Sequence, residues 1–95
     1  MYAVVLRPSA TRALRETLPT AVAGAVVELL EGPLRQDPHA IGKPLDPPYD
    51  GWRVVRRGEY RVIYEIHDDQ RRVAALRVAH RRDAYRGRPT GDQAA

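Results

Sequence analysis

Residues 52–66 read Trp-Arg-Val-Val-Arg-Arg-Gly-Glu-Tyr-Arg-Val-Ile-Tyr-Glu-Ile, and the rest of the chain can be interpreted outward from them. The β-branched and aromatic residues favour strands, and Gly58 divides the stretch into two predicted strands, about 52–57 and 60–67. The same strands carry four arginines: Arg53, Arg56, Arg57 and Arg61. Two interpretations are open. Either the arginines form a solvated face, or the sheet presents cations to a polyanion.

Length and composition narrow the class of protein. The chain has 95 residues, enough for one compact domain, and it contains no cysteine for a disulfide or a thiolate metal site. No apolar run approaches the ~20 residues that span a bilayer, and the N-terminus lacks the pattern of a signal peptide. We therefore expect a cytoplasmic protein that has no membrane partner.

The formal net charge is +4, and the positive charge is concentrated in the strand-rich half of the chain. Residues 1–51 contain five Lys/Arg against six Asp/Glu, whereas residues 52–88 contain eleven Arg against five Asp/Glu. Of the sixteen basic residues, only Lys43 is not arginine, the side chain that binds phosphate through paired hydrogen bonds and stacks on bases. The asymmetry favours a nucleic acid or an acidic protein as partner.

Residues 2–51 predict a strand, two helices and a long connection. The strand covers residues 2–7 and ends at Pro8, and Ser9 is the expected N-cap of a short helix over about 10–17. A second helix is expected to begin near Pro19 and to end or kink near Pro33. Its apolar stripe consists of Val22, Val26, Leu29, Leu30 and Leu34. Four prolines and two glycines predict that residues 36–51 contain no regular element, with Ile41, Leu45 and Tyr49 as anchors.

The C-terminal half completes an α+β domain. A polar turn at 67–70 leads to a last strand over 71–80 and a short helical turn over 81–86. The order β-α-α-β-β-β predicts a small, antiparallel-rich sheet with two helices packed on one face. We expect one domain over residues 1–86 and a flexible tail over 87–95.

Strand alternation assigns side chains to two faces of this sheet. The apolar set on the second central strand, expected against the helices, is Tyr60, Val62, Tyr64 and Ile66. Arg61 then points to the open face, Arg53 is expected to reach the same side, and Arg56 to lie on the opposite one. On the last strand, we expect Ala74, Leu76 and Val78 against the helices, and Arg77 and Arg81 on the open side.

Three other residues or groups carry candidate chemistry. His80 is either a phosphate ligand or proton carrier beside the open face, or a packed side chain. Tyr85 is either an anchor for the last turn or an acid–base group among arginines. The run His67-Asp68-Asp69 contains metal-ligand types, but adjacent turn residues seldom converge on one ion, so we expect an ordinary polar turn.

Three motifs give the chain a family resemblance. They are Asp37-Pro38-His39 with Gly42-Lys43-Pro44-Leu45, the run Arg56-Arg57-Gly58-Glu59-Tyr60-Arg61-Val62-Ile63-Tyr64, and the closing His80-Arg81-Arg82-Asp83-Ala84-Tyr85. Together with the element order, they resemble the RelE/ParE toxin superfamily of bacterial type II toxin–antitoxin systems over about residues 2–86. Within the superfamily, the chain is more similar to the RelE branch.

The resemblance implies an endoribonuclease that cuts messenger RNA in the ribosomal A site, without metal or cofactor. The 2′-hydroxyl would attack the adjacent phosphate. Arg61 matches the family's phosphate ligand and transition-state stabiliser, and Arg81 matches the late arginine, in a similar role or as acid. Tyr85 matches the tyrosine that stacks on or orients the nucleotide. Arg53 falls where the family has its first catalytic lysine. The second lysine falls at Val55, which leaves the general base unassigned.

The expected RNA-binding side chains around these catalytic candidates are Arg56, Arg57, Arg77, His80 and Arg82. The resemblance also implies an acidic antitoxin that forms a hetero-oligomer with the toxin, besides the ribosome and mRNA as partners. Two alternatives share the fold: a ParE-type inhibitor of DNA gyrase, and a non-catalytic module that only binds an antitoxin.

Overall fold

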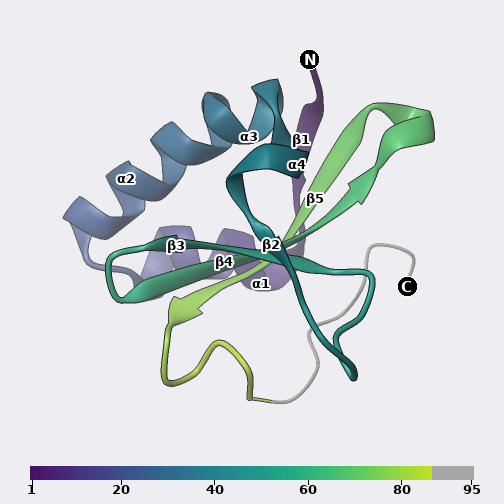
Figure 1. Ribbon diagram of the computed structural model, residues 1–95. Helices are drawn as coiled ribbons and strands as arrows, with labels where there is room; N and C mark the ends of the chain where they lie inside the picture. Colours follow the sequence, from purple (N-terminus) through teal and green to yellow (C-terminus); the bar gives the residue numbers. More distant parts are fainter. Residues whose placement is uncertain (87–95) are drawn as a thin grey trace.

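The structure, a computed structural model, describes residues 1–86 (Figure 1). Five strands form one mixed sheet in the order β1-β5-β4-β3-β2. Their bounds are Ala3–Leu6 (β1), Lys43–Pro44 (β2), Arg53–Arg57 (β3), Tyr60–His67 (β4) and Arg72–His80 (β5). β1 runs parallel to β5, and the other pairs are antiparallel. The predicted α+β, antiparallel-rich sheet is confirmed, and the two-residue β2 is an addition to it. The predicted tail, 87–95, lies outside the described residues.

The helical segments lie between β1 and β2. They are α1 (Pro8–Arg12), the π-helical turn η1 (Ala13–Thr17), α2 (Thr20–Glu31), α3 (Pro33–Gln36) and α4 (Pro38–Ile41). A 3₁₀ turn, η2 (Asp68–Gln70), joins β4 to β5. The prediction of Ser9 as N-cap was wrong, because Pro8 occupies the first turn and Arg7 precedes it. Proline is favoured there because its fixed φ suits the helix and its missing N–H has no partner to lose. Within the described residues, no helix is long and apolar enough to cross a bilayer.

The main core lies between the sheet and the helices, as predicted. α1, η1 and α2 contribute Ala10, Ala13, Val26, Leu29 and Leu30, and the sheet contributes Val55, Val62, Tyr64, Val73, Ala75 and Val78. Leu34 of α3 also belongs to this core. Each fully buried aliphatic side chain contributes roughly 1.5–3 kcal/mol relative to an exposed one. The stripe that periodicity predicted on the second helix is therefore the stripe that holds it to the sheet.

A second, smaller apolar cluster covers part of the other face of the sheet. Its buried members are Trp52, Ile63, Ala74, Leu76 and Ala84, and Leu45 and Tyr49 pack against them. The connection before β3 and the turn after β5 therefore both fold over this face. The expected anchors Ile41, Leu45 and Tyr49 are confirmed as packed residues.

The face assignment of β5 was partly wrong, because the β4–β5 ladder changes register. Tyr64 pairs with Ala75 but Ile63 pairs with Arg77, so Leu76 is the extra residue of a β-bulge. Ala74 and Leu76 therefore belong to the second cluster and not to the helix-side core. Val78 faces the helices as expected. Arg77 shares the face of Ile63, also as expected.

Residues 36–51 contain two short regular elements, α4 and β2, where an irregular connection was expected. A close contact explains why the chain takes this path. Tyr64 is buried and its hydroxyl donates to the Pro38 carbonyl at 2.7 Å. A Cβ on Gly42 would collide with that hydroxyl and would lie 2.8 Å from the Val54 carbonyl oxygen. Glycine therefore permits β2 to reach the sheet edge over the Tyr64 ring.

Candidate functional site

Two arginines lie side by side on the face of the sheet opposite the helices. Arg56 of β3 pairs directly with Arg61 of β4, next to the tight turn at Gly58 and Glu59. Directly opposite residues have Cβ atoms about 4.5–5.5 Å apart and share one face. The placement of Arg61 on this face is confirmed. The expectation that Arg56 lies on the opposite face was wrong, and the two-residue turn, which pairs Arg57 with Tyr60, sets the actual register.

The Arg56–Arg61 pair carries uncompensated positive charge. One Arg61 guanidinium nitrogen, Nη1, donates to the Gly58 and Tyr60 carbonyls, at 3.2 Å each. Within residues 1–86, neither guanidinium forms an ion pair with a carboxylate. Like charges directly opposite each other in a sheet are destabilising. An anion bound between them would remove that repulsion.

Arg81 lies next to this pair, at the end of β5. Its backbone N–H donates to the Glu59 carbonyl at 2.7 Å, and its Nε lies 3.2 Å from Glu59 Oε2. Both side chains are 61% exposed, so the ion pair is solvent-screened and weak. A phosphate can replace the Glu59 carboxylate as the partner of Arg81 without a large energetic loss.

Tyr85 lies on the turn that crosses the same face, and it is 40% exposed. The Tyr49 hydroxyl donates to the Tyr85 carbonyl at 2.8 Å, and the two ring centroids are 6.0 Å apart. Arg77 holds this turn in place, because its Nη1 donates to the Ala84 carbonyl at 3.0 Å and to the Arg86 carbonyl at 2.8 Å. The Arg77 guanidinium thus supports the backbone around Tyr85.

A groove of about 300 Å³ connects Tyr85 to the edge of the sheet. Its polar lining consists of Lys43, Arg56, Arg57 and Tyr85. Lys43 pairs with Val54, so it lies on the same face as Arg56. Sequence reasoning missed Lys43 as a site residue, since only the pairing of β2 with β3 brings it here. The motif that contains it was the one available signal.

Several expected site residues lie elsewhere. Arg53 pairs with Tyr64 and faces the helix side, where its Nη2 donates to the carbonyls of His39 at 2.7 Å and Gly42 at 2.8 Å. The expectation that Arg53 reaches the open face was therefore wrong. His80 pairs with Tyr60, which is also on the helix side, and the two rings meet edge to face at 5.4 Å.

Arg57 and Arg82 occupy intermediate positions. Arg57 pairs with Tyr60 and so leaves the strand on the helix side, although it also borders the groove. Arg82 is exposed on the final turn, and its N–H donates to His80 Nδ1 at 3.2 Å. Arg56 therefore lies opposite Arg61, Arg81 is bonded to the adjoining turn, and Tyr85 and Lys43 share the groove with Arg56. We call these five residues the basic face.

A separate polar cluster lies at the opposite end of the molecule. The Tyr2 hydroxyl donates to Asp68 Oδ1 at 2.5 Å, and His39 Nε2 lies 2.9 Å from the same oxygen. The Arg71 guanidinium stacks on the Tyr2 ring, 4.5 Å from its centroid. The hydrogen bond from Tyr2 lowers the pKa of Asp68 below its ordinary value, and the same bond raises the pKa of Tyr2. The expected polar turn at 67–70 is confirmed, and its role here is to connect β1, α4 and the β4–β5 hairpin.

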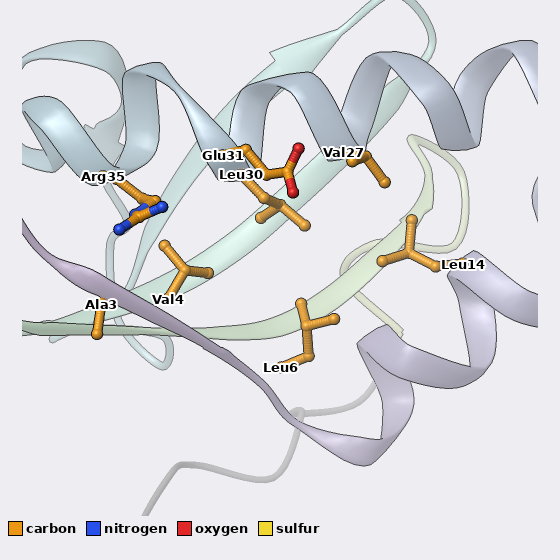
Figure 2. A pocket seen from close by; sticks show the side chains of 8 residues that line it. All are labelled: Ala3, Val4, Leu6, Leu14, Val27, Leu30, Glu31 and Arg35. Carbon is orange, nitrogen blue, oxygen red and sulfur yellow. The ribbon is translucent and has the colours of Figure 1, made fainter.

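The helix side carries an apolar groove of about 490 Å³ between β1, η1 and α2 (Figure 2). Its lining residues are Ala3, Val4, Leu6, Leu14, Val27, Leu30, Glu31 and Arg35. Figure 2 shows Val27, Leu30 and Leu14 pointing into the space between the two helical segments and the strand. Val27 remains 39% exposed, so the groove offers apolar surface to a partner.

Comparison with known proteins assigns the family. A family model described as the ParE toxin of the type II toxin–antitoxin system parDE matches residues 4–85. The chain belongs to the RelE/ParE superfamily of type II toxins. The Toxin RelE of Mycobacterium tuberculosis is 42% identical to this superfamily member over 88 residues, covering 93% of this chain and 90% of the relative. The Toxin RelG of the same organism is 42% identical over 85 residues, covering 90% and 97%.

Solved structures support the same assignment. The toxin–antitoxin complex RelBE2 from M. tuberculosis matches this RelE/ParE chain with a TM-score of 0.78 and 40% identity, covering 83% of this chain and 96% of that one. The isolated RelE toxin of E. coli matches with a TM-score of 0.70 at 18% identity, covering 84% of each chain, which shows the shared fold. The predicted fold and the predicted RelE-like family are both confirmed.

Proposed function

We propose that this chain is the toxin of a type II toxin–antitoxin pair and acts as a ribosome-dependent endoribonuclease on mRNA. The observation that carries the proposal is the Arg56–Arg61 pair, which has no carboxylate partner within residues 1–86. Arg56 shares a groove with Tyr85, and Arg81 is bonded to the turn beside the pair. Cleavage by attack of a 2′-hydroxyl on the adjacent phosphate places extra negative charge on phosphorus-bound oxygens in the transition state. Fixed guanidinium groups are suited to stabilise that charge.

The roles follow from position. Arg61 and Arg56 would bind the non-bridging oxygens of the scissile phosphate, because they project side by side from adjacent strands. Arg81 would exchange its weak contact with Glu59 for a phosphate oxygen. Tyr85 is half-exposed on a braced turn and offers a ring on which a base can stack. Arg82, exposed on the same turn, would contact the RNA backbone.

The test is to add the purified protein to ribosomes translating a defined mRNA and to map cuts by primer extension. We expect cuts within codons in the A site and products that end in a 2′,3′-cyclic phosphate or its opened form. Cleavage should persist when EDTA is added, once the magnesium requirement of the ribosomes is controlled for. The double variant Arg56→Ala/Arg61→Ala is the inactive control. Intact mRNA under conditions that support translation would exclude the nuclease function.

Inhibition of DNA gyrase is the second candidate, because the matching family model is described as a ParE toxin. A supercoiling assay run in parallel separates the two. Inhibited gyrase with intact mRNA would assign the chain to the gyrase-poisoning class. Absence of both activities would leave an antitoxin-binding module.

An antitoxin partner is supported by the toxin–antitoxin complexes among the similar structures, including RelBE2. We propose that the partner is acidic and acts in the cytoplasm, and that it combines two kinds of contact. Its carboxylates would pair with the basic face, and its apolar side chains would fill the groove of Figure 2. Binding should weaken with salt without vanishing. Expression with and without the neighbouring open reading frame tests this, since the lone toxin should arrest growth.

A further inference from the structure

The arginines of the basic face cannot act as a general base, and Lys43 is a residue of that face whose side chain can. The family resemblance places two catalytic lysines on the second strand, but this chain has Arg53 and Val55 at the matching positions. Lys43 is the one lysine of the chain. It comes from a different strand, β2, at the edge of the sheet, yet its pairing with Val54 turns it to the side of Arg56 and Arg61.

In this register, Lys43 and Arg56 lie close enough together to contact the same substrate. Lys43 is the diagonal neighbour of Arg56, and such neighbours have Cα atoms about 7–8 Å apart across an antiparallel pair. A phosphate held by Arg56 therefore lies within reach of a four-carbon lysine side chain. Lys43 is exposed and lines the groove together with Arg56, Arg57 and Tyr85.

The polar side chains that line this groove differ in whether they can accept or donate a proton. The guanidinium groups of Arg56 and Arg57 stay protonated and cannot accept a proton. His80 lies on the helix side, against Tyr60. Lys43 and Tyr85 are the two polar lining residues of the groove that can exchange a proton. A lysine amine can accept a hydroxyl proton through its nitrogen lone pair, and a phenol hydroxyl is suited to donate one.

We infer that Lys43 is the general base of the cleavage reaction, an inference that rests on the proposed nuclease function. The neutral amine takes the proton of the 2′-hydroxyl while the 2′-oxygen forms its bond to phosphorus. The bond from phosphorus to the 5′-oxygen of the next nucleotide breaks, and the electron pair stays on that oxygen. The Tyr85 hydroxyl supplies a proton to it. Solvent then removes the proton from Lys43 and returns one to Tyr85.

This assignment also explains how the chain can do without the family's strand lysines. Arg56, Arg61 and Arg81 carry the charge of the transition state, and Lys43 carries only the proton. The base enters the site from the strand β2, which reaches its position because Gly42 fits against Tyr64 and Arg53 holds the adjacent carbonyls. Arg53 is then a positioning residue for the segment that carries the base.

The experiment uses single-turnover cleavage of a model mRNA bound to programmed ribosomes, with Lys43→Arg and Lys43→Ala. Loss of a general base typically costs 10²–10⁴-fold, so both variants should cleave about 10²-fold more slowly or worse. Lys43→Arg keeps the charge and should bind the ribosome complex as the wild type does. Added methylamine should restore part of the rate of Lys43→Ala. Arg15→Ala, a charge removal on η1, is the matched control and should cleave normally.

A second substrate separates base from acid. A 5′-bridging phosphorothiolate provides a leaving group that needs no proton. On this substrate the defect of Lys43→Ala should persist, whereas the defect of Tyr85→Phe should largely disappear. Wild-type cleavage by Lys43→Arg, or disappearance of the Lys43→Ala defect on the phosphorothiolate, would overturn the role of Lys43 alone. A wild-type protein that leaves ribosome-bound mRNA intact would overturn the nuclease function and, with it, this inference.

Discussion

Some arginines of this chain hydrogen-bond the backbone of distant segments, and others remain available to bind a ligand. Arg53 donates to two carbonyls of the α4–β2 segment, and Arg77 donates to two carbonyls of the final turn. Arg56 and Arg61 instead project side by side from neighbouring strands, with no carboxylate partner among the described residues, and the two carbonyl contacts of Arg61 are long and lie within its own turn. The first two arginines therefore belong to the architecture, and the last two are available to a ligand.

The contrast predicts opposite consequences for two alanine substitutions. Arg61→Ala should lower the rate of mRNA cleavage by ~10²-fold or more, as expected when a fixed charge ligand of a transition state is removed, and should leave the melting temperature nearly unchanged. Arg53→Ala should lower the melting temperature because two carbonyls of the α4–β2 segment lose their donor, whereas the longer contacts of Arg61 reach only carbonyls of its own turn. Thermal denaturation and single-turnover cleavage at a temperature well below the transition measure both effects. An unchanged melting temperature in Arg53→Ala would contradict the structural role of Arg53.

Tyr64 offers a test of the buried contact under β2. Tyr64→Phe removes the donor to the Pro38 carbonyl, which we expect to lower the free energy of unfolding by about 1–3 kcal/mol. Burial raises the pKa of this hydroxyl, so it remains a donor across the physiological range. Chemical denaturation measures the loss. Tyr60→Phe is the control, since Tyr60 is only partly buried, and equal losses in the two variants would contradict the argument.

Among the secondary-structure elements, the β4–β5 hairpin has the largest influence on the site. The bulge at Leu76 places Leu76 and Arg77 on the same face, opposite Ile63. Leu76 thereby joins the second apolar cluster, and Arg77 reaches the carbonyls of the final turn. The bulge thus has two effects: Leu76 covers the sheet, and Arg77 supports the turn that carries Tyr85.

Asp68, in the turn at the far end of this hairpin, should make the stability of the fold decrease at acid pH. Asp68 has a lowered pKa in the folded protein, below its ordinary value of 3.8, because Tyr2 and His39 hydrogen-bond its carboxylate. A lowered pKa stabilises the fold above the ordinary value, and this stabilisation is lost as the pH falls through the folded pKa. We therefore expect the melting temperature of the wild type to exceed that of Asp68→Asn near neutral pH.

The difference in melting temperature between wild type and Asp68→Asn should shrink as the pH is lowered toward ~3. Asp69→Asn, which changes the neighbouring exposed carboxylate, is the matched control and should follow the wild type. A constant difference between wild type and Asp68→Asn from neutral to acid pH would show that the charge of Asp68 is not the stabilising feature.

The whole molecule has two different sides. One side of the sheet, beyond the second apolar cluster, presents the basic face. The helix side presents the apolar groove between β1, η1 and α2 (Figure 2). In the proposed complex, an inhibitory partner would bind through the groove and would cover the basic face.

Separate surfaces predict that antitoxin binding and catalysis can be uncoupled. Val27→Asp introduces a charge into the apolar groove and should weaken antitoxin binding by about tenfold or more, because the carboxylate would lose its water on binding. The rate of mRNA cleavage should stay unchanged. Isothermal titration with the purified antitoxin measures the first effect. Ala21→Asp, on the exposed part of the same helix, is the control, and an equal loss in both variants would exclude the groove as the binding surface.

Local features of the sequence determined much of this protein. Alternating β-branched and aromatic residues predicted β3, β4 and β5, and the Val22–Leu34 stripe predicted the helix that covers them. The same alternation placed Arg61 away from the helices. These predictions hold because the side-chain period of a strand or a helix depends on neighbours along the chain. The clustering of arginine likewise indicated the half of the chain that carries four of the five residues of the basic face.

Only the tertiary structure decided which side chains share the site. Arg56 joins Arg61, and Arg53 does not, because the register of the β3–β4 hairpin is set by its turn. A register change in β5 placed Ala74 and Leu76 on the face opposite to the predicted one, since a shift of one residue moves a side chain to the other face. Lys43 reaches the groove through its pairing with Val54, a contact between residues eleven positions apart in sequence. Such pairings depend on packing across the whole fold, so residue spacing alone does not predict them.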